Sequence, residues 1–234
     1  MWLLAGCLAI LGSLAGRAFR WLVFLGAQHR GIGIGRLFST LTIGFFGNTI
    51  LPARAGEFLR PYMLARAEPV RFTEAFATVV VERVFDLIVV VLAFAVTFVL
   101  APFPEEVIAS RAETFSNLKF FGAVMAAATI AGTGMLCLMV RAPLKCRSIF
   151  SRLIRWLPSH FQDRLLHALQ SFIDGLSAFG SLGAFLRSLL WTGIIWFTIL
   201  LSEYFTILAF GFEVSLFGTM ILMSLLAFSV MVPQ

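Results

Sequence analysis

Long apolar runs constrain this chain more than any other feature of its sequence. Five of them, at residues 2–24, 75–101, 119–140, 185–210 and 215–232, approach or exceed the roughly 20 residues that a helix needs to cross a bilayer. Of the 234 residues, 60% are hydrophobic and 13% are charged, whereas a soluble domain has about 25% charged residues. The sequence therefore predicts an all-α, polytopic membrane protein with about five spanning helices. The same composition argues against a nucleic-acid-binding domain or a soluble enzyme.

Basic residues are distributed unevenly along the chain, at the ends of these runs and between them. Segments 17–36 and 141–187 are rich in arginine and lysine, whereas segment 102–117 holds more glutamate than arginine. By the positive-inside rule, the first two segments lie in the cytoplasm and the third lies outside. We therefore expect a multi-pass protein of the cell inner membrane, with residues 1–234 forming a single transmembrane domain.

The short apolar stretch 37–51 does not fit a simple span. The run before it is expected to end inside and the run after it to begin inside, so residues 37–66 must enter and leave on the same side. Pro52 and Gly56 interrupt residues 37–66, which predicts a re-entrant hairpin there. Broken backbone at membrane depth is tolerated only beside protein or a wet cavity, and it marks binding sites in transporters.

Residues 141–184 are expected to form a cytoplasmic interfacial linker of two amphipathic helices. One apolar stripe runs from Ile149 to Leu157, and Pro158 ends it. A capping-box pattern at Ser159–Gln162 then starts the second helix. The last run ends without flanking charge, and the first begins outside; we read both as signs that the chain is part of a longer protein.

Charged residues inside the apolar regions are the candidates for function. The hairpin holds Arg54, Glu57 and Arg60, and the following span holds Glu82, Arg83 and Asp86. Each unpaired charge at the centre of a spanning helix costs roughly 2.5–3.5 kcal/mol. The hairpin set carries a net charge of +1 and the helix set carries −1, so we expect the two sets to pair.

The predicted roles divide this set in two. Arg54 and Arg60 are expected to bind an anionic lipid headgroup, because the planar guanidinium binds two phosphate oxygens at once. The remaining polar cluster comprises Asn48, Glu57, Glu82, Arg83 and Asp86. The alternative is that all these ions are structural and hold the hairpin on its neighbouring helix. Glu203 has no basic residue within a helical turn; it is expected either to reach a partner on another helix or to line a polar path.

Motifs for catalysis or cofactor binding are not apparent in the sequence. There is no HExxH or GxSxG pattern, and the three cysteines are widely spaced. We therefore expect neither a metal site nor a cofactor, and we lean towards a protein that is not an enzyme.

Two motifs together resemble a known family. Asn48-Thr-Ile-Leu-Pro-Ala-Arg-Ala-Gly-Glu-Phe-Leu-Arg-Pro61, followed by Val80-Val-Glu-Arg-Val-Phe-Asp-Leu87, is similar to the flippase-like family that includes the transmembrane region of lysylphosphatidylglycerol synthases. The resemblance implies an all-helical inner-membrane protein that translocates a phospholipid or a polyprenyl-linked lipid, or forms part of such a transporter. Its expected partners are membrane lipids of anionic or polyprenyl-phosphate type. A membrane protein partner or a homo-oligomer is also possible on this reading.

Two other functions compete with lipid transport. One is a membrane-embedded enzyme that modifies a lipid headgroup, with Glu57 or Asp86 as its acid or base. The other is an accessory subunit of a lipid or glycan synthesis complex, docking a partner enzyme through Ile154 and Leu157.

Overall fold

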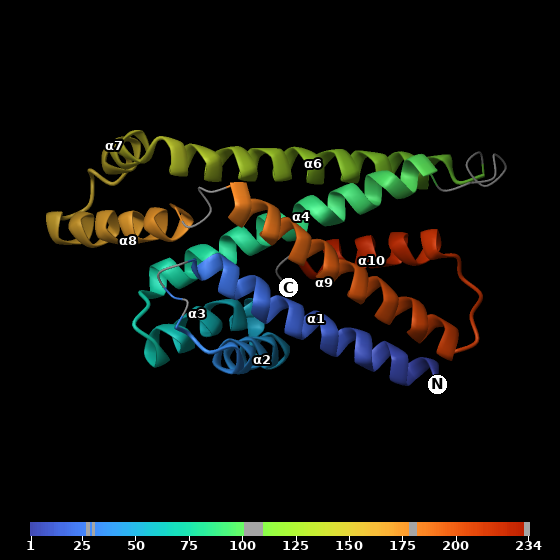
Figure 1. The fold of residues 1–234 in the computed structure, drawn as a ribbon. Helices are drawn as coiled ribbons and strands as arrows, with labels where there is room; N and C mark the ends of the chain where they lie inside the picture. The colour runs from blue at the N-terminus through green and yellow to red at the C-terminus, as the bar shows by residue number, and fades with distance from the viewer. Residues whose placement is uncertain (27–28, 30, 101–109, 178–181, 232–234) are drawn as a thin grey trace.

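The computed structural model describes residues 1–26, 29, 31–100, 110–177 and 182–231. All regular structure within these ranges is helical (Figure 1). In chain order the elements are α1 (Trp2–Leu25), α2 (Ile34–Ile50), the 3-10 helix η2 (Pro52–Arg54), α3 (Gly56–Ala67), α4 (Phe72–Leu100), α6 (Ala112–Arg141), α7 (Pro143–Leu153), α8 (Ser159–Ser177), α9 (Leu182–Ala209) and α10 (Leu216–Met231). The all-α class predicted from the apolar runs is confirmed.

Three of these helices are long and apolar enough to cross a membrane by length and composition, namely α1, α6 and α9. Helix α4 is 29 residues long, but three charged residues interrupt its apolar sequence. Helix α10 is apolar but only 16 residues long, which is shorter than the roughly 20 residues of a typical span. The number of five spans therefore stays a prediction. In the acidic segment expected outside the membrane, residues 102–109 lie outside the described ranges.

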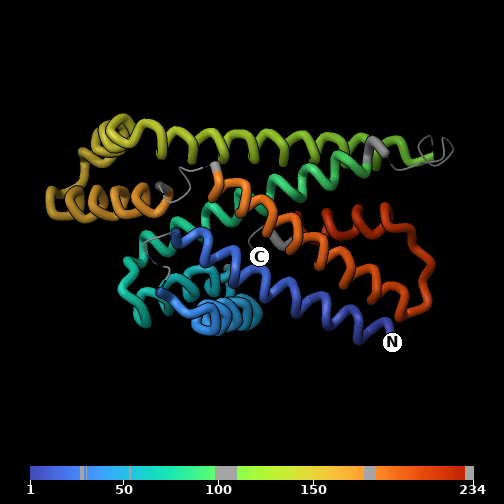
Figure 2. Tube along the Cα trace, in the orientation of Figure 1, coloured from blue at the N-terminus to red at the C-terminus, as the bar shows by residue number. Residues whose placement is uncertain are grey.

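Helices α1 and α9 run antiparallel along most of their lengths, as Figures 1 and 2 show. Small residues let them approach closely, which is the usual means of helix association in lipid. Gly6 lies against Ser202, whose hydroxyl donates a hydrogen bond to the Gly6 carbonyl at 2.9 Å. Helix α4 crosses the molecule and packs against α1, α3, α6, α8, α9 and α10, so residues on it are well placed to join several elements.

Helices α2 and α3 form the hairpin predicted for residues 37–66. They pack together around glycines, and a Cβ atom on Gly56 would lie 1.9 Å from the Gly44 carbonyl oxygen. Helix α2 ends at Ile50, just before Pro52, and η2 separates the two α-helices. The break in the backbone is therefore where the sequence predicts it, and the re-entrant position of the hairpin in a bilayer stays a prediction.

Helices α7 and α8 form the linker between α6 and α9. Helix α8 packs on α4 through its second half, where Ile173 and Leu176 are buried. Helix α8 begins at Ser159, where the sequence predicts its start. The expected capping box is wrong, because the Gln162 backbone N–H donates to the Pro158 carbonyl and its side-chain amide donates to the Leu157 carbonyl at 2.7 Å. The apolar stripe is also shorter than expected, because α7 ends at Leu153.

Candidate functional site

Four buried ions lie where α1, α3 and α4 meet. Glu82 and Asp86 are one turn apart on α4, and both are 1% exposed. Arg60 on α3 pairs with Glu82 at 2.6 Å, and Arg20 on α1 pairs with Glu82 at 2.9 Å and Asp86 at 2.7 Å. We call Arg20, Arg60, Glu82 and Asp86 the buried ion layer.

Aromatic and hydroxyl side chains surround this layer. The Arg60 guanidinium lies 4.5 Å from the centre of the Trp21 ring, a cation–π contact that strengthens when both groups are desolvated. From α9, the Trp196 indole donates to Asp86 at 3.2 Å, and Thr192 accepts a hydrogen bond from Arg20 at 3.0 Å. The buried ion layer thus connects α1, α3, α4 and α9.

A second, more open group of ions lies beside the first. Arg54 in η2 pairs with Glu57 at 2.9 Å, and Arg83 on α4 approaches the same Glu57 oxygen at 3.8 Å. Their side chains are 24–27% exposed, against 0–6% in the buried ion layer. We call Arg54, Glu57 and Arg83 the pocket ions. Arg83 links the two groups, because its guanidinium also lies 3.2 Å from Glu82 and 3.5 Å from Asp86.

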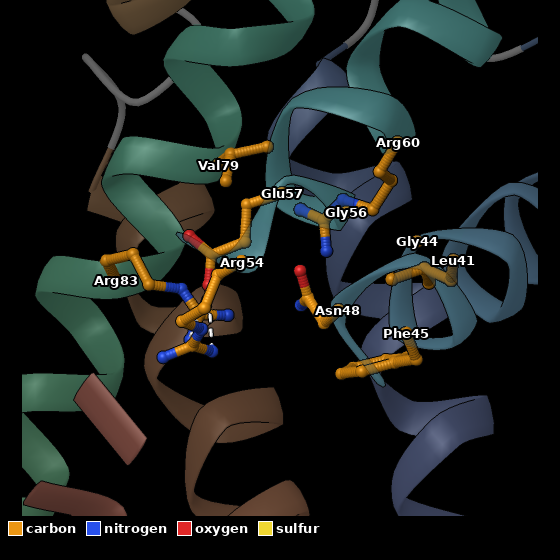
Figure 3. Close-up of a pocket in the computed structure, with 10 residues that line it drawn as sticks. All are labelled: Leu41, Gly44, Phe45, Asn48, Arg54, Gly56, Glu57, Arg60, Val79 and Arg83. Carbon is orange, nitrogen blue, oxygen red and sulfur yellow. Dashed lines mark ion pairs between the residues drawn. The ribbon is translucent and has the colours of Figure 1, made fainter. Parts of the chain in front are cut away.

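The pocket ions line a cavity of about 20 Å³, which has room for about one water molecule. Figure 3 shows Asn48 and Phe45 on one side of this pocket and the pocket ions on the other. The lining residues are Leu41, Gly44, Phe45, Asn48, Arg54, Gly56, Glu57, Arg60, Val79 and Arg83. Among the described residues, the Asn48 Oδ1 atom and the Nε atoms of Arg60 and Arg83 are buried without a hydrogen-bond partner. Buried polar groups are normally satisfied, so this pocket offers polar groups to a ligand.

Arg54 also has an uncommon backbone conformation. Its φ is +55°, and it is the one non-glycine residue with positive φ in the described ranges. Strained backbone of this kind persists where its surroundings hold it, and it gathers at functional sites. The turn between Pro52 and Gly56 thus fixes the direction in which Arg54 projects.

The site carries more positive charge than the sequence predicts. Arg17 on α1 lies 3.6 Å from Glu82 and 4.0 Å from Asp86. With Arg17 and Arg20 included, five arginines face three carboxylates in the described structure, leaving a formal excess of two positive charges. The arginines are Arg17, Arg20, Arg54, Arg60 and Arg83, and the carboxylates are Glu57, Glu82 and Asp86.

The sequence-based prediction used Arg17 and Arg20 only to orient the first helix, with its positive end inside, and did not include them in the ion cluster that they join from α1. A periodic signal was present: Arg17, Arg20 and the buried Trp21 and Phe24 follow helical spacing and share one face. Their charge was read only as marking the cytoplasmic end of the helix, whereas their spacing indicates one shared face.

Glu203 does not belong to this cluster. It lies on α9, and its Oε2 atom is buried without a hydrogen-bond partner in the described structure. A role for Glu203 in a polar path stays a prediction, as do the headgroup-binding roles of Arg54 and Arg60. Arg54 and Arg60 differ in their exposure to solvent. Arg60 is buried against Glu82, whereas Arg54 lies at the open side of the cluster.

Comparison with known proteins identifies the family to which this chain is similar. The family model described as the lysylphosphatidylglycerol synthase TM region matches residues 1–234. A curated protein of Haloferax volcanii, named glycosyltransferase AglD, is 38% identical over 56 residues, which are 24% of this chain and 9% of that relative. The chain thus matches only a small part of the relative's length. No solved structure matches it significantly.

Proposed function

The chain belongs to the family of the lysylphosphatidylglycerol synthase TM region, and on that premise we propose that it translocates an anionic phospholipid or a polyprenyl-linked lipid across the inner membrane, alone or as part of a transporter. The family and the name of the archaeal relative support a membrane protein in lipid- or glycan-related processes. The observation that carries the finer proposal is the excess of positive charge around a pocket with unsatisfied polar atoms.

In this proposal the phosphate of the headgroup takes the place of Glu57. The pocket holds about one water molecule, so a phosphate fits only when the Glu57 carboxylate moves away from Arg54 and Arg83. Both guanidinium groups then bind phosphate oxygens, for which their planar geometry is suited. The Asn48 side chain faces the same space (Figure 3). The apolar chains of the lipid stay in the bilayer while the headgroup passes the broken hairpin.

Lipid translocation by the chain reconstituted into vesicles tests this function. The wild type is expected to move a fluorescent anionic phospholipid between leaflets, and Arg54→Ala is expected to abolish most of that movement. Arg66→Ala is the matched control, because Arg66 is exposed on the same hairpin and contacts Tyr62 outside the pocket. Movement that is equal in Arg54→Ala and wild type contradicts the proposal.

A second candidate is an enzyme, or an accessory subunit of an enzyme complex, that modifies a lipid headgroup. The name of the archaeal relative, a glycosyltransferase, favours it. Glu57 is the carboxylate best placed for such a role, because Asp86 is buried against Arg20. Docking of a partner through Ile154 is disfavoured, because Ile154 is buried in this chain. Mass spectrometry of the lipids separates the candidates, since translocation leaves their mass unchanged.

A further inference from the structure

Helix α7 has an apolar face that the described chain does not cover. None of its residues is buried. Ile149 and Leu153 lie one turn apart on this face and are 63% and 69% exposed, and Trp156, just beyond the helix, is 81% exposed. An exposed apolar face of this kind indicates an interaction with a membrane or with another protein.

Basic residues border this apolar face and lie at both ends of α7. Five basic residues lie in this region and are exposed, namely Arg141, Lys145, Arg147, Arg152 and Arg155. There is no acidic residue from 141 to 162. We call residues 141–156 the basic corner. A helix with an apolar face bordered by lysine and arginine is typical of one that lies in the membrane interface.

The position of α7 in the fold agrees with this pattern. Helix α6 has 30 residues, so it is about 45 Å long, which exceeds the roughly 30 Å of the hydrocarbon core. Its last residue, Arg141, therefore reaches the headgroup region when α6 spans the bilayer. The chain then turns at Ala142, and Figure 1 shows α7 nearly end-on while α6 lies in the plane of the view. Helix α7 thus crosses the end of α6, a direction that lies along the membrane surface when α6 spans the bilayer.

We propose that the basic corner is a binding surface for anionic lipids, with Ile149, Leu153 and Trp156 inserted among the acyl chains and the basic residues on the headgroups. The charge decides between a membrane and a protein partner, because five basic residues without an acid complement an anionic leaflet. This surface is separate from the pocket, and the inference does not depend on lipid translocation.

Fluorescence quenching on the full chain tests this surface. Cys7, Cys137 and Cys146 are replaced by serine, because none of the three is buried. A fluorophore is then attached through Ile149→Cys on the apolar face or, as the matched control, through Ser148→Cys on the polar face. Quenching by aqueous acrylamide is measured in vesicles of phosphatidylcholine alone and in vesicles containing phosphatidylglycerol.

In the anionic vesicles the label at residue 149 is expected to be shielded and the label at 148 to stay accessible. Changing Lys145, Arg147, Arg152 and Arg155 to glutamine is expected to weaken the shielded state about fivefold per residue removed. High salt is expected to have the same effect without any substitution, because it screens the headgroup charge.

Three results overturn the inference. Equal accessibility of the two labels in anionic vesicles shows that the face does not contact the bilayer. Equal shielding at residue 149 in both kinds of vesicle removes the preference for anionic lipid. Shielding that requires an added protein assigns the face to a protein partner.

Discussion

The buried ion layer and the pocket ions lie side by side on α4 but differ in their access to solvent. The buried layer balances two arginines with two carboxylates within the protein, at distances of 2.6–2.9 Å. The pocket ions have contacts of 2.9 and 3.8 Å to Glu57, partial exposure and a strained backbone at Arg54. The same residue types can therefore connect buried helices in one place and remain partly exposed to solvent in the next.

The two groups of ions are also expected to contribute differently to the stability of the fold. Removing one partner of a buried ion pair leaves an uncompensated charge and is strongly destabilising. An exposed pair contributes about 0–1 kcal/mol. We therefore expect substitutions in the buried ion layer to lower the stability of the protein and substitutions of the pocket ions to impair its function.

The largest effect is expected for Glu82→Gln. This change leaves Arg20 and Arg60 without their shared carboxylate in a buried site, and it should lower stability by about 3–5 kcal/mol. Thermal unfolding in detergent, followed by circular dichroism, measures the loss. Glu57→Gln is the control and should cost less than about 1 kcal/mol. Similar losses in the two variants would remove the distinction between the groups.

The hairpin that positions the pocket ions should be sensitive to Gly56→Ala. The added methyl group would meet the Gly44 carbonyl at 1.9 Å, so α2 and α3 must separate at a cost of about 1–3 kcal/mol or more. Gly12→Ala is the control, because nothing lies within 4 Å of a Cβ atom there. An unchanged unfolding temperature in Gly56→Ala would contradict the close packing of the hairpin.

Arg60→Lys tests whether Arg60 has a structural role, as expected for a member of the buried ion layer. The lysine keeps the charge but loses the planar contact with Trp21, and we expect a loss of about 1–2 kcal/mol in unfolding free energy. Arg66→Lys, at an exposed cation–π contact with Tyr62, should cost less. Normal stability with impaired lipid translocation in Arg60→Lys would instead place Arg60 among the ligand-binding groups.

The smallest effect is expected at Arg54. Replacement by glycine and by alanine removes the same side-chain interactions, but only glycine adopts a φ of +55° without strain. We therefore expect Arg54→Gly to be more stable than Arg54→Ala by about 1 kcal/mol, as measured by thermal unfolding. Equal stability would argue against backbone strain at this turn.

Much of this architecture could be predicted from the sequence. The helical class, the break between Pro52 and Gly56, and the family resemblance carried by residues 48–61 and 80–87 are confirmed. These features are local, because apolar length, proline and glycine act on the backbone near them.

The composition of the ion cluster could not be predicted in the same way. Arg20 and Asp86 are 66 residues apart in the chain, and only the packing of α1 on α4 brings them together. Counting charges within segments used Arg17 and Arg20 only to orient the first helix, and it balanced the remaining ions at zero. The excess of positive charge appears only when the tertiary contacts are known, as does the burial that separates Arg60 from Arg54.

Native mass spectrometry of the purified chain tests the central claim most directly. The account predicts that the wild type and Arg66→Ala carry a bound anionic lipid, and that Arg54→Ala loses it while keeping its folded helical content. Retention of the same lipid by Arg54→Ala, or selective binding of no anionic lipid by the wild type, would contradict a headgroup site at the pocket ions.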